Sequence, residues 1–309
     1  MNKITIVGAG RVGESTAQFL ASRDMCHELL LLDVREGAAE GAALDIQEDA
    51  PLFQFDTKVS GSNKPQDMTD SELIIITAGI PRKPGMSRSD VLTTNVKITD
   101  EIVKNAMQYA ADAMLLFVSN PVDILTYRGW KVCGWPRNRV FGQAGVLDAT
   151  RMASFIAMET GFSALDIDAM VLGGHGDSMV PMIRYTTISG IPVANFLPQK
   201  TITDIISRTR NGGAEILALR QNSSAYDAPA AAIATMVDAI VHDRKRILPS
   251  VAILDNEYGH HDIAIGVPTV LGKNGIEKVI ELSFSKEEQV AFEQSVTMVK
   301  KDIETLKNL

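Results

Sequence analysis

The sequence of 309 residues has few cysteines, no long apolar run and no excess of positive charge. Its two cysteines, Cys26 and Cys133, lack the spacing of a metal site, and so few suit a reducing compartment. No apolar run approaches the roughly 20 residues that span a bilayer, and the first one is too short for a signal peptide. The formal net charge of −8 disfavours nucleic acid and anionic membranes as partners. We therefore expect a soluble, cytoplasmic protein that binds no metal.

Short apolar runs alternate with helical patterns through the first half of the chain. The runs read "KITIV", "ELLLLDV", "SELIIITAG" and "AMLLFVSNP". Runs that are apolar on both faces suit strands of a parallel sheet that helices cover on each side. Alternation of strands with helices indicates βαβ units. The fold class we predict is α/β, with a Rossmann doubly wound parallel sheet in residues 1–145.

The pattern changes after residue 145. The runs "ALDIDAMVLGG", "ILPSVAILD" and "DIAIGVPTVLG" suggest strands with hairpin-like connections, interrupted by helices near residues 202–221 and 227–243. The last segment opens with the capping box Ser285 and Glu288. Its apolar residues recur at spacings of three and four, which favours an amphipathic helix docked on its own domain over a short coiled coil. We predict that residues 146–309 form an α+β substrate domain.

The glycines of "GAGRVG" follow a predicted strand and open a predicted helix. They allow a tight turn, close approach of the backbone to a pyrophosphate, and close helix–strand packing, and the helix N-terminus attracts the phosphates. Asp33 comes 20 residues after Gly13, the separation expected for a carboxylate that binds a ribose 2′-hydroxyl. That carboxylate favours NAD over NADP, although Arg35 nearby weakens the preference. We expect NAD to contact Gly8, Ala9, Gly10, Arg11, Val12, Gly13 and Asp33.

Residues suited to substrate chemistry gather in three later segments. His175 stands among glycines in "GGHGD", where a ligand can approach a side chain that titrates near neutral pH. Asn120 follows a predicted strand in "SNPVD", and Asp148 and Arg151 lie three residues apart on a predicted helix. Ligands of open α/β sheets bind outside the carboxyl ends of the strands. Taken alone, Asp148 and Arg151 could also be an ordinary charge pair on a helix.

The basic segment "PRKPGMSR" follows another predicted strand. It could be a solvated surface loop, but beside the other motifs we interpret it as part of a binding site.

Five ordered motifs, "GAGRVG", "AGIPRKPGMSR", "SNPVD", "GVLDATR" and "GGHGD", resemble the lactate/malate dehydrogenase family. The likeness covers essentially the whole chain and is strongest to those malate-specific members that share the lactate dehydrogenase architecture. It implies reversible, NAD-dependent oxidation of (S)-malate to oxaloacetate.

The resemblance also implies a role for each site residue. His175 would take the hydroxyl proton as hydride leaves the substrate, and Asp148 would accept a hydrogen bond from its other ring nitrogen. Arg151 would hold the C1 carboxylate in a bidentate grip. Asn120 would bond the reacting oxygen, and Arg88 would polarise the carbonyl once its loop closes. Catalysis would therefore depend on His175 and Asp148, with Arg88, Asn120 and Arg151 binding the substrate.

Arg82 decides the substrate that we expect. Members of the family that use pyruvate or lactate typically have glutamine here, and those that use oxaloacetate or malate have arginine. A second carboxylate in a poorly solvated site needs its own cation, so Arg82 favours the four-carbon dicarboxylate. On the cofactor side, the resemblance adds Asn95, Asn120 and the backbone around Val118 near the nicotinamide ribose. It also implies a homodimer or a homotetramer.

Three other functions remain alternatives. A lactate or other 2-hydroxyacid dehydrogenase would share the chemistry, but Arg82 disfavours it. An NAD-dependent glycosidase would need a divalent metal and a longer chain. A sensor that only binds NAD would not need His175, Asp148 and Arg151 together. The remaining histidines lack partners at metal spacing, so we assign them to the surface or to a helix face: His27, His242, His260 and His261.

Overall fold

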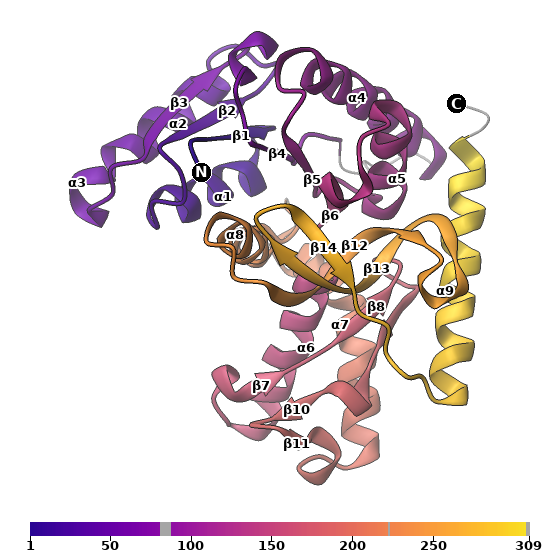
Figure 1. The fold of residues 1–309 in the computed structure, drawn as a ribbon. Coiled ribbons are helices and arrows are strands. Elements are labelled where there is room, and N and C mark those ends of the chain that lie inside the picture. The colour runs from indigo at the N-terminus through magenta and orange to yellow at the C-terminus, as the bar shows by residue number, and fades with distance from the viewer. Residues whose placement is uncertain (81–87, 222, 307–309) are drawn as a thin grey trace.

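The protein is described by a computed structural model that covers residues 1–80, 88–221 and 223–306. Within these residues most strands join one sheet, which passes through both halves of the chain (Figure 1). The strands of the first half are β1 (Lys3–Val7), β2 (Glu28–Leu32), β3 (Lys58–Ser62), β4 (Leu73–Ile76), β5 (Met114–Phe117) and β6 (Val140–Gly142). They are parallel and have the order β3-β2-β1-β4-β5-β6 of a dinucleotide-binding sheet. The predicted α/β, doubly wound fold is confirmed.

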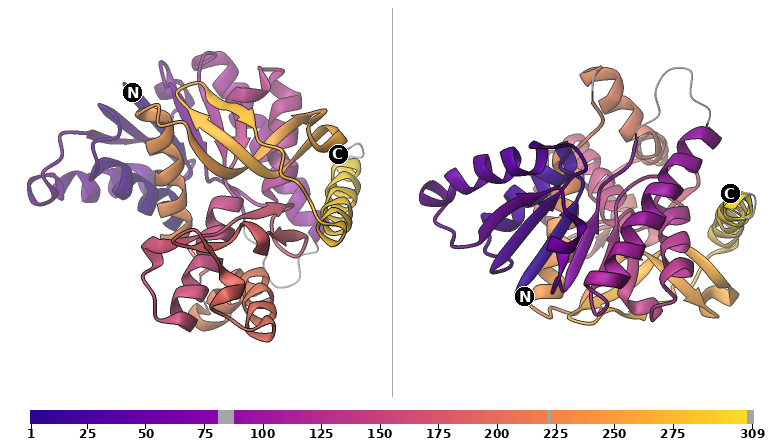
Figure 2. Two further views of the ribbon diagram at one scale, coloured as in Figure 1. Left: turned by 60° about the horizontal axis from the view of Figure 1, so that its bottom comes forward. Right: turned by 90° about the horizontal axis from the view of Figure 1, so that it is seen from above.

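Both faces of this parallel sheet are apolar and covered. Leu31 and Ile75 enter one core cluster, whereas their chain neighbours Leu30 and Ile74 enter the other. This is why the strands read as continuous apolar runs rather than as alternating ones. The right-hand view of Figure 2 shows helices on both sides of the strands. The helices of this half are α1 (Arg11–Ala21), α2 (Ala38–Glu48), α3 (Ala50–Phe53), α4 (Arg88–Tyr109) and α5 (Val122–Cys133), with short 3-10 turns η1 (Pro65–Met68) and η2 (Arg137–Arg139).

The second half continues the same sheet with antiparallel strands. Its strands are β7 (Ile167–Asp168), β8 (Val171–Gly173), β9 (Met179–Pro181), β10 (Thr187–Ile188), β11 (Ile191–Pro192), β12 (Arg246–Asp255), β13 (His261–Gly272) and β14 (Gly275–Val279). β12 pairs with β6, and β13, β8 and β9 follow in that order, with β14 on β13. The strands β11, β10 and β7 form a separate small sheet. The sheet thus runs across residue 145, where the division into two domains stays a prediction.

The helices of the second half pack on both halves of the molecule. They are α6 (Gly145–Thr160), α7 (Gln199–Arg220), α8 (Asp227–Val241) and α9 (Lys286–Thr305), with 3-10 turns η3 (Ala164–Asp166), η4 (Ile183–Tyr185), η5 (Val193–Asn195) and η6 (Glu257–Gly259). α8 packs against α1, and the two predicted helices correspond to α7 and α8. No helix of the described residues is both long and apolar enough to cross a membrane.

The C-terminal helix α9 runs along one side of the molecule and contacts α5, β8, β9 and β13 (Figure 1). Its capping box is complete: the Ser285 side chain accepts from the Glu288 N–H, and the Glu288 carboxylate accepts from the Ser285 N–H. Phe292, Val296 and Val299 are buried against the rest of the chain. The predicted docked amphipathic helix is confirmed, because these apolar residues already have partners.

One stretch differs from its predicted conformation. The run "ALDIDAMVLGG" is not a single strand but a 3-10 turn, η3, followed by the short strands β7 and β8. The Ser163 hydroxyl accepts a hydrogen bond from the Leu165 N–H and so starts the turn, and Leu165 itself is exposed. A local side-chain bond to the backbone here competes with strand pairing. β8 then ends at Gly173, two residues before His175.

Candidate active site

The carboxyl ends of β4 and β5 are joined by hydrogen bonds. The Val118 N–H donates to the Ile76 carbonyl at 3.0 Å, and the Ser119 hydroxyl donates to the Ala78 carbonyl at 2.6 Å. The loop that carries Asn120 therefore has a fixed position beside the end of β4. This is the edge of the sheet where the sequence predicts a ligand.

The glycine loop between β1 and α1 is shaped by close contacts. Gly8 has φ +111°, and a Cβ on Gly13 would lie 1.9 Å from the Gly8 carbonyl oxygen. By contrast, a Cβ on Gly10 would meet no atom within 4 Å. Gly10 is the N-cap of α1, and no side chain caps the helix there. The space beside Gly10 and the uncapped N–H groups fit an anionic pyrophosphate.

Asp33 lies directly after β2, next to this loop. Its carboxylate accepts hydrogen bonds from the Ala9 N–H at 2.9 Å and from the Arg35 Nε at 2.9 Å. Burial raises the pKa of Asp33, but the hydrogen bonds from Arg35 and Ala9 outweigh it and hold the pKa below its usual value. The Arg35 guanidinium also donates to the Ala9 carbonyl at 2.8 Å. The predicted ribose ligand is thus ionised and beside the glycine loop, with Arg35 across it.

Asn95 is buried between the ends of two strands. Its amide oxygen accepts from the Ile80 N–H at 2.8 Å, and its amide nitrogen donates to the Asn120 carbonyl at 2.8 Å. The family resemblance implies a contact of Asn95 with the nicotinamide ribose, which stays a prediction. In the structure its polar atoms bind the backbone on either side, so Asn95 positions Asn120.

His175, Asp148 and Arg151 come together although they belong to different elements. His175 Nδ1 lies 2.9 Å from Asp148 Oδ2, and Arg151 Nη1 lies 3.3 Å from Asp148 Oδ1. Asp148 is fully buried in the first turn of α6, whereas 21% of the His175 side chain is exposed. Burial lowers the pKa of His175, but the carboxylates of Asp148 and Asp123 outweigh it and raise the pKa. Among the described residues no hydrogen bond is formed by His175 Nε2, so this atom can exchange a proton with a ligand.

The Arg151 side chain is mostly buried and only partly paired. Its Nε atom is buried without a hydrogen-bond partner among the described residues. A guanidinium binds a carboxylate best through two parallel hydrogen bonds. Arg151 therefore retains donors for an anionic ligand next to His175.

The sequence analysis missed two residues of the site, Asp123 and Ser295. The backbone N–H of His175 donates to Asp123 Oδ2 at 2.8 Å, and the N–H of Gly174 donates to the Ser295 hydroxyl at 2.8 Å. Asp123 belongs to the quoted motif "SNPVD", but nothing in the pattern separates a buried acid from the exposed acids common in first helical turns. Ser295 comes from α9, far along the chain, and carries no local signal.

Some predicted residues cannot be placed in this cluster. Arg82 lies outside the described residues, and so does the side chain of Arg88, whose backbone begins α4. Of the other histidines, His27 is exposed and His260 Nε2 contacts Glu293 at 3.2 Å. Within the described ranges, no group of three or more His, Cys, Asp or Glu could hold a metal ion.

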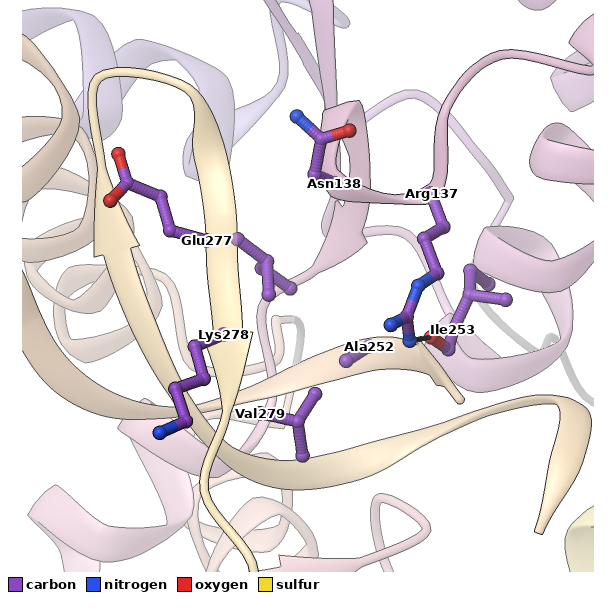
Figure 3. Close-up of a pocket in the computed structure, with 8 residues that line it drawn as sticks. Arg137, Asn138, Ala252, Ile253, Glu277, Lys278 and Val279 are labelled. Atoms are coloured by element: carbon purple, nitrogen blue, oxygen red, sulfur yellow. Dashed lines mark hydrogen bonds between the residues drawn. The ribbon is translucent and has the colours of Figure 1, made fainter. Parts of the chain in front are cut away.

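A small pocket lies elsewhere, at the amino end of β6. Figure 3 shows the residues of η2, β12 and β14 that line it. Its volume is about 230 Å³. The Arg137 guanidinium, which lines it, donates to the Ile253 carbonyl at 3.0 Å and pairs with Glu257. Because ligands of such sheets bind at the opposite, carboxyl edge, this pocket is separate from the His175 cluster.

Comparison with known proteins agrees with this geometry. The family described as lactate/malate dehydrogenase matches twice, with its NAD-binding domain over residues 2–142 and its alpha/beta C-terminal domain over residues 145–309. The chain belongs to the lactate/malate dehydrogenase family. It is an NAD-dependent oxidoreductase of that family, as the sequence motifs predict.

Similar proteins carry the name malate dehydrogenase. The one from Thioalkalivibrio sulfidiphilus is 68% identical over 99% of this chain and 100% of its own length. The one from Pseudomonas putida is 54% identical over the whole of both chains. Among solved structures, malate dehydrogenase from Picrophilus torridus has 41% identity and a TM-score of 0.96, over 99% of this chain and 98% of its own.

Similarity of fold does not separate the two activities of the family. A lactate dehydrogenase from Cryptosporidium parvum, solved with lactic acid and the cofactor, also has a TM-score of 0.96. It is 36% identical and covers 100% of this chain and 98% of its own. The choice of substrate must therefore depend on individual side chains at the site.

Proposed function

We propose that this enzyme catalyses the reversible oxidation of (S)-malate to oxaloacetate, with NAD as hydride acceptor. The observation that carries the proposal is the His175–Asp148–Arg151 cluster at the edge of the sheet that holds the glycine loop. A proton carrier, a carboxylate that orients it and a cation for a substrate carboxylate are the groups this reaction needs. The 68% and 54% identical relatives named malate dehydrogenase support the substrate.

Most of the residues that would hold NAD follow the carboxyl ends of β1, β2 and β5. The loop from Gly8 to Gly13, with Ala9, Arg11 and Val12, would bind the pyrophosphate, and Asp33 would bind the adenosine ribose. Asn95, Val118 and Asn120 would lie on the nicotinamide side. NAD supplies the acceptor for the hydride that leaves C2 of malate.

The side chains of the protein would handle the proton and the charges. In malate oxidation His175 accepts the hydroxyl proton at Nε2, and in oxaloacetate reduction it returns that proton. Asp148 keeps the proton on Nδ1 and stabilises the imidazolium. Arg151, whose Nε has no partner among the described residues, would bind the C1 carboxylate, and Asn120 would bond the reacting oxygen.

Selection of a dicarboxylate is assigned to Arg82, with Arg88 polarising the carbonyl. A second substrate carboxylate entering a poorly solvated site requires a cation, and Arg82 is the residue that the family resemblance places there. Neither side chain lies within the described structure, so the sequence alone supports these two roles.

Three further properties belong to the proposal. The change from parallel strands to antiparallel ones after β6 supports a division into residues 1–145 and 146–309. Two widely spaced cysteines support a reducing compartment such as the cytoplasm. The family resemblance supports a homodimer or a homotetramer, which light scattering coupled to gel filtration would distinguish.

The catalytic assignment is tested by His175→Asn. The variant should bind NADH normally but should lose most of its kcat, because only proton transfer is removed. NADH binding is followed by fluorescence and turnover by absorbance of the reduced cofactor. Turnover comparable to that of the native protein would refute the assignment.

The substrate is tested by initial rates of NADH oxidation with oxaloacetate and with pyruvate at equal concentrations. We expect a strong preference for oxaloacetate. Arg82→Gln should lower kcat/KM for oxaloacetate and raise it for pyruvate. An unchanged ratio would remove Arg82 from substrate selection, and a native preference for pyruvate would make the protein a lactate dehydrogenase.

A further inference from the structure

A buried carboxylate lies behind the catalytic histidine. Asp123 is in the first turn of α5, three residues after Asn120, and is 6% exposed. Its Oδ2 accepts the hydrogen bond from the backbone N–H of His175 at 2.8 Å. Two carboxylates thus flank His175, Asp148 at the ring and Asp123 at the main chain.

The carboxylate of Asp123 is only partly satisfied. Its Oδ1 is buried and has no hydrogen-bond partner among the described residues. Burying an anion is costly, and a neutral acceptor of the same shape could accept the His175 N–H at lower cost. The hydrogen bond alone therefore does not explain why an aspartate, rather than a neutral acceptor, stands at position 123.

The surroundings of Asp123 direct its charge toward His175. Among the described residues, Asp148 from α6 and Arg151 one turn later also act on the charge of the histidine. Ser178 and Ser295 bind the carbonyl and the N–H of Gly174, the residue before His175. Burial raises the pKa of Asp123 to about 6, so the group is mostly ionised at neutral pH.

We propose that Asp123 is a positioning residue for proton transfer, which fixes the main chain of His175 and adds a second negative charge that stabilises its imidazolium. The proposal rests on the proposed function of His175 as the proton carrier. Asp123 contacts neither ring nitrogen of His175, so it acts through the histidine. Its hydrogen bond fixes where the ring lies, and its charge affects how tightly the ring holds a proton.

The proposal predicts the direction of the pH profiles. Oxaloacetate reduction needs protonated His175 and declines as pH rises through the pKa of the imidazole. Malate oxidation needs the neutral ring and rises with pH through the same pKa. Removing the negative charge of Asp123 makes the proton easier to lose, so both curves should move to lower pH.

The test compares Asp123→Asn with a matched control. Asparagine can still accept the His175 N–H but carries no charge. The control, Asp100→Asn, also removes one negative charge next to α5, but Asp100 pairs with Arg128 and not with His175. In Asp123→Asn the pKa in kcat/KM should fall by roughly 0.5 to 1 unit in both reaction directions. The profile of Asp100→Asn should match that of the native protein.

A second readout does not depend on turnover. The ring C2 proton of His175 is identified in NMR spectra by its absence in His175→Asn, and its pKa is then titrated without substrate. A lower pKa in Asp123→Asn supports the proposal even if the native protein had no activity with malate, a result that would refute only the proposed function. An unchanged pKa in an active, folded variant overturns the proposal.

Folding of the variants is checked by NADH binding and thermal unfolding. Asp123→Ser, a smaller neutral acceptor, replaces Asp123→Asn if the latter does not fold. A lower His175 pKa in the serine variant supports the charge effect, and an unchanged one overturns it.

Discussion

The guanidinium of Arg35 covers the carboxylate of Asp33, with Nε 2.9 Å from Oδ1 and one terminal nitrogen 3.0 Å from Oδ2. The same terminal nitrogen donates to the Ala9 carbonyl. Arg35 is largely exposed, whereas the Asp33 side chain is mostly buried. Asp33, the acid that would select NAD, thus neutralises Arg35, a nearby cation that could bind a 2′-phosphate.

Asp33→Ala should free Arg35 and change the cofactor preference. We expect kcat/KM with NAD to fall by roughly tenfold or more, because a charge-assisted hydrogen bond to the ribose is lost. The value with NADP should rise, since the repulsion is removed and a guanidinium becomes available. In the control Arg35→Ala, Asp33 still repels the phosphate, so the use of NADP should not increase. Equal NADP use by both variants would contradict the argument.

Gly10→Ala should separate cofactor binding from folding. The backbone at Gly10 is extended and an added Cβ meets no protein atom within 4 Å, so the variant should have the same unfolding temperature as the native protein. NAD affinity should nevertheless fall by roughly tenfold or more, on the order of 1.4 kcal/mol, because the methyl group occupies the space beside the pyrophosphate.

The matched control is Gly41→Ala in α2, where an added Cβ also meets open space. It should bind NAD normally. Gly13→Ala is the opposite case, because its Cβ would lie 1.9 Å from the Gly8 carbonyl oxygen, and it should fail to fold normally. Calorimetric titration of NAD into each folded variant gives the affinities. Native affinity in Gly10→Ala would show that the cofactor does not approach this loop.

Ser295→Ala should lower both stability and turnover. The Gly174 N–H is buried and would lose its acceptor, which costs about 1–3 kcal/mol of the free energy of unfolding. The turn that carries His175 would loosen, so kcat should also fall. Ser285→Ala removes the capping box and should lower the free energy of unfolding by roughly 0.5–2 kcal/mol, the usual cost of a lost helix cap. Its kcat should not change.

Urea unfolding and steady-state kinetics on the two serine variants check this pair of expectations. If Ser295→Ala lost stability but kept its kcat, α9 would stabilise the fold without fixing the position of His175. If both variants lost turnover alike, the effect would come from general destabilisation.

The sequence predicted the parts of the site that obey local rules. The parallel strands appear as continuous apolar runs, and the glycines of "GAGRVG" are constrained within one loop, so both are visible in the printed chain. The meeting of His175 with Asp148 followed from the family resemblance, and the structure places the two side chains in contact.

Other features depend on contacts that no local pattern contains. The burial of Asp123 is set by the packing of α5 under the turn after β8, and Ser295 reaches that turn from a helix more than a hundred residues away. The side-chain amide oxygen and nitrogen of Asn95 form hydrogen bonds with backbone groups of two other loops. The Ser163 turn, which breaks a predicted strand, depends on a single hydroxyl.

The charge of Asp123 should reduce the stability of the protein at neutral pH. The pKa of this buried acid is raised from 3.8 to about 6, so the folded state holds its proton more tightly than the unfolded state. The stabilising contribution of protonated Asp123 to folding is therefore fully present below pH 4 and is lost as pH rises through about 6. Asp123→Asn cannot ionise and avoids this loss. Relative to the native protein, the variant should gain about 1–3 kcal/mol between pH 4 and pH 7.5.

Urea unfolding of both proteins at a series of pH values measures this difference. His175 changes in the same direction, because its pKa is also raised and falls when Asp123 loses its charge. Asp100→Asn serves again as the control. This variant lacks the salt bridge of Asp100 with Arg128, so its stability relative to the native protein should not rise over this interval. If the difference in the free energy of unfolding between Asp123→Asn and the native protein stayed constant from pH 4 to pH 7.5, Asp123 would not change its charge in the folded state near pH 6. A gain together with a lowered His175 pKa would mean that the protein keeps a destabilising charge because proton transfer uses it.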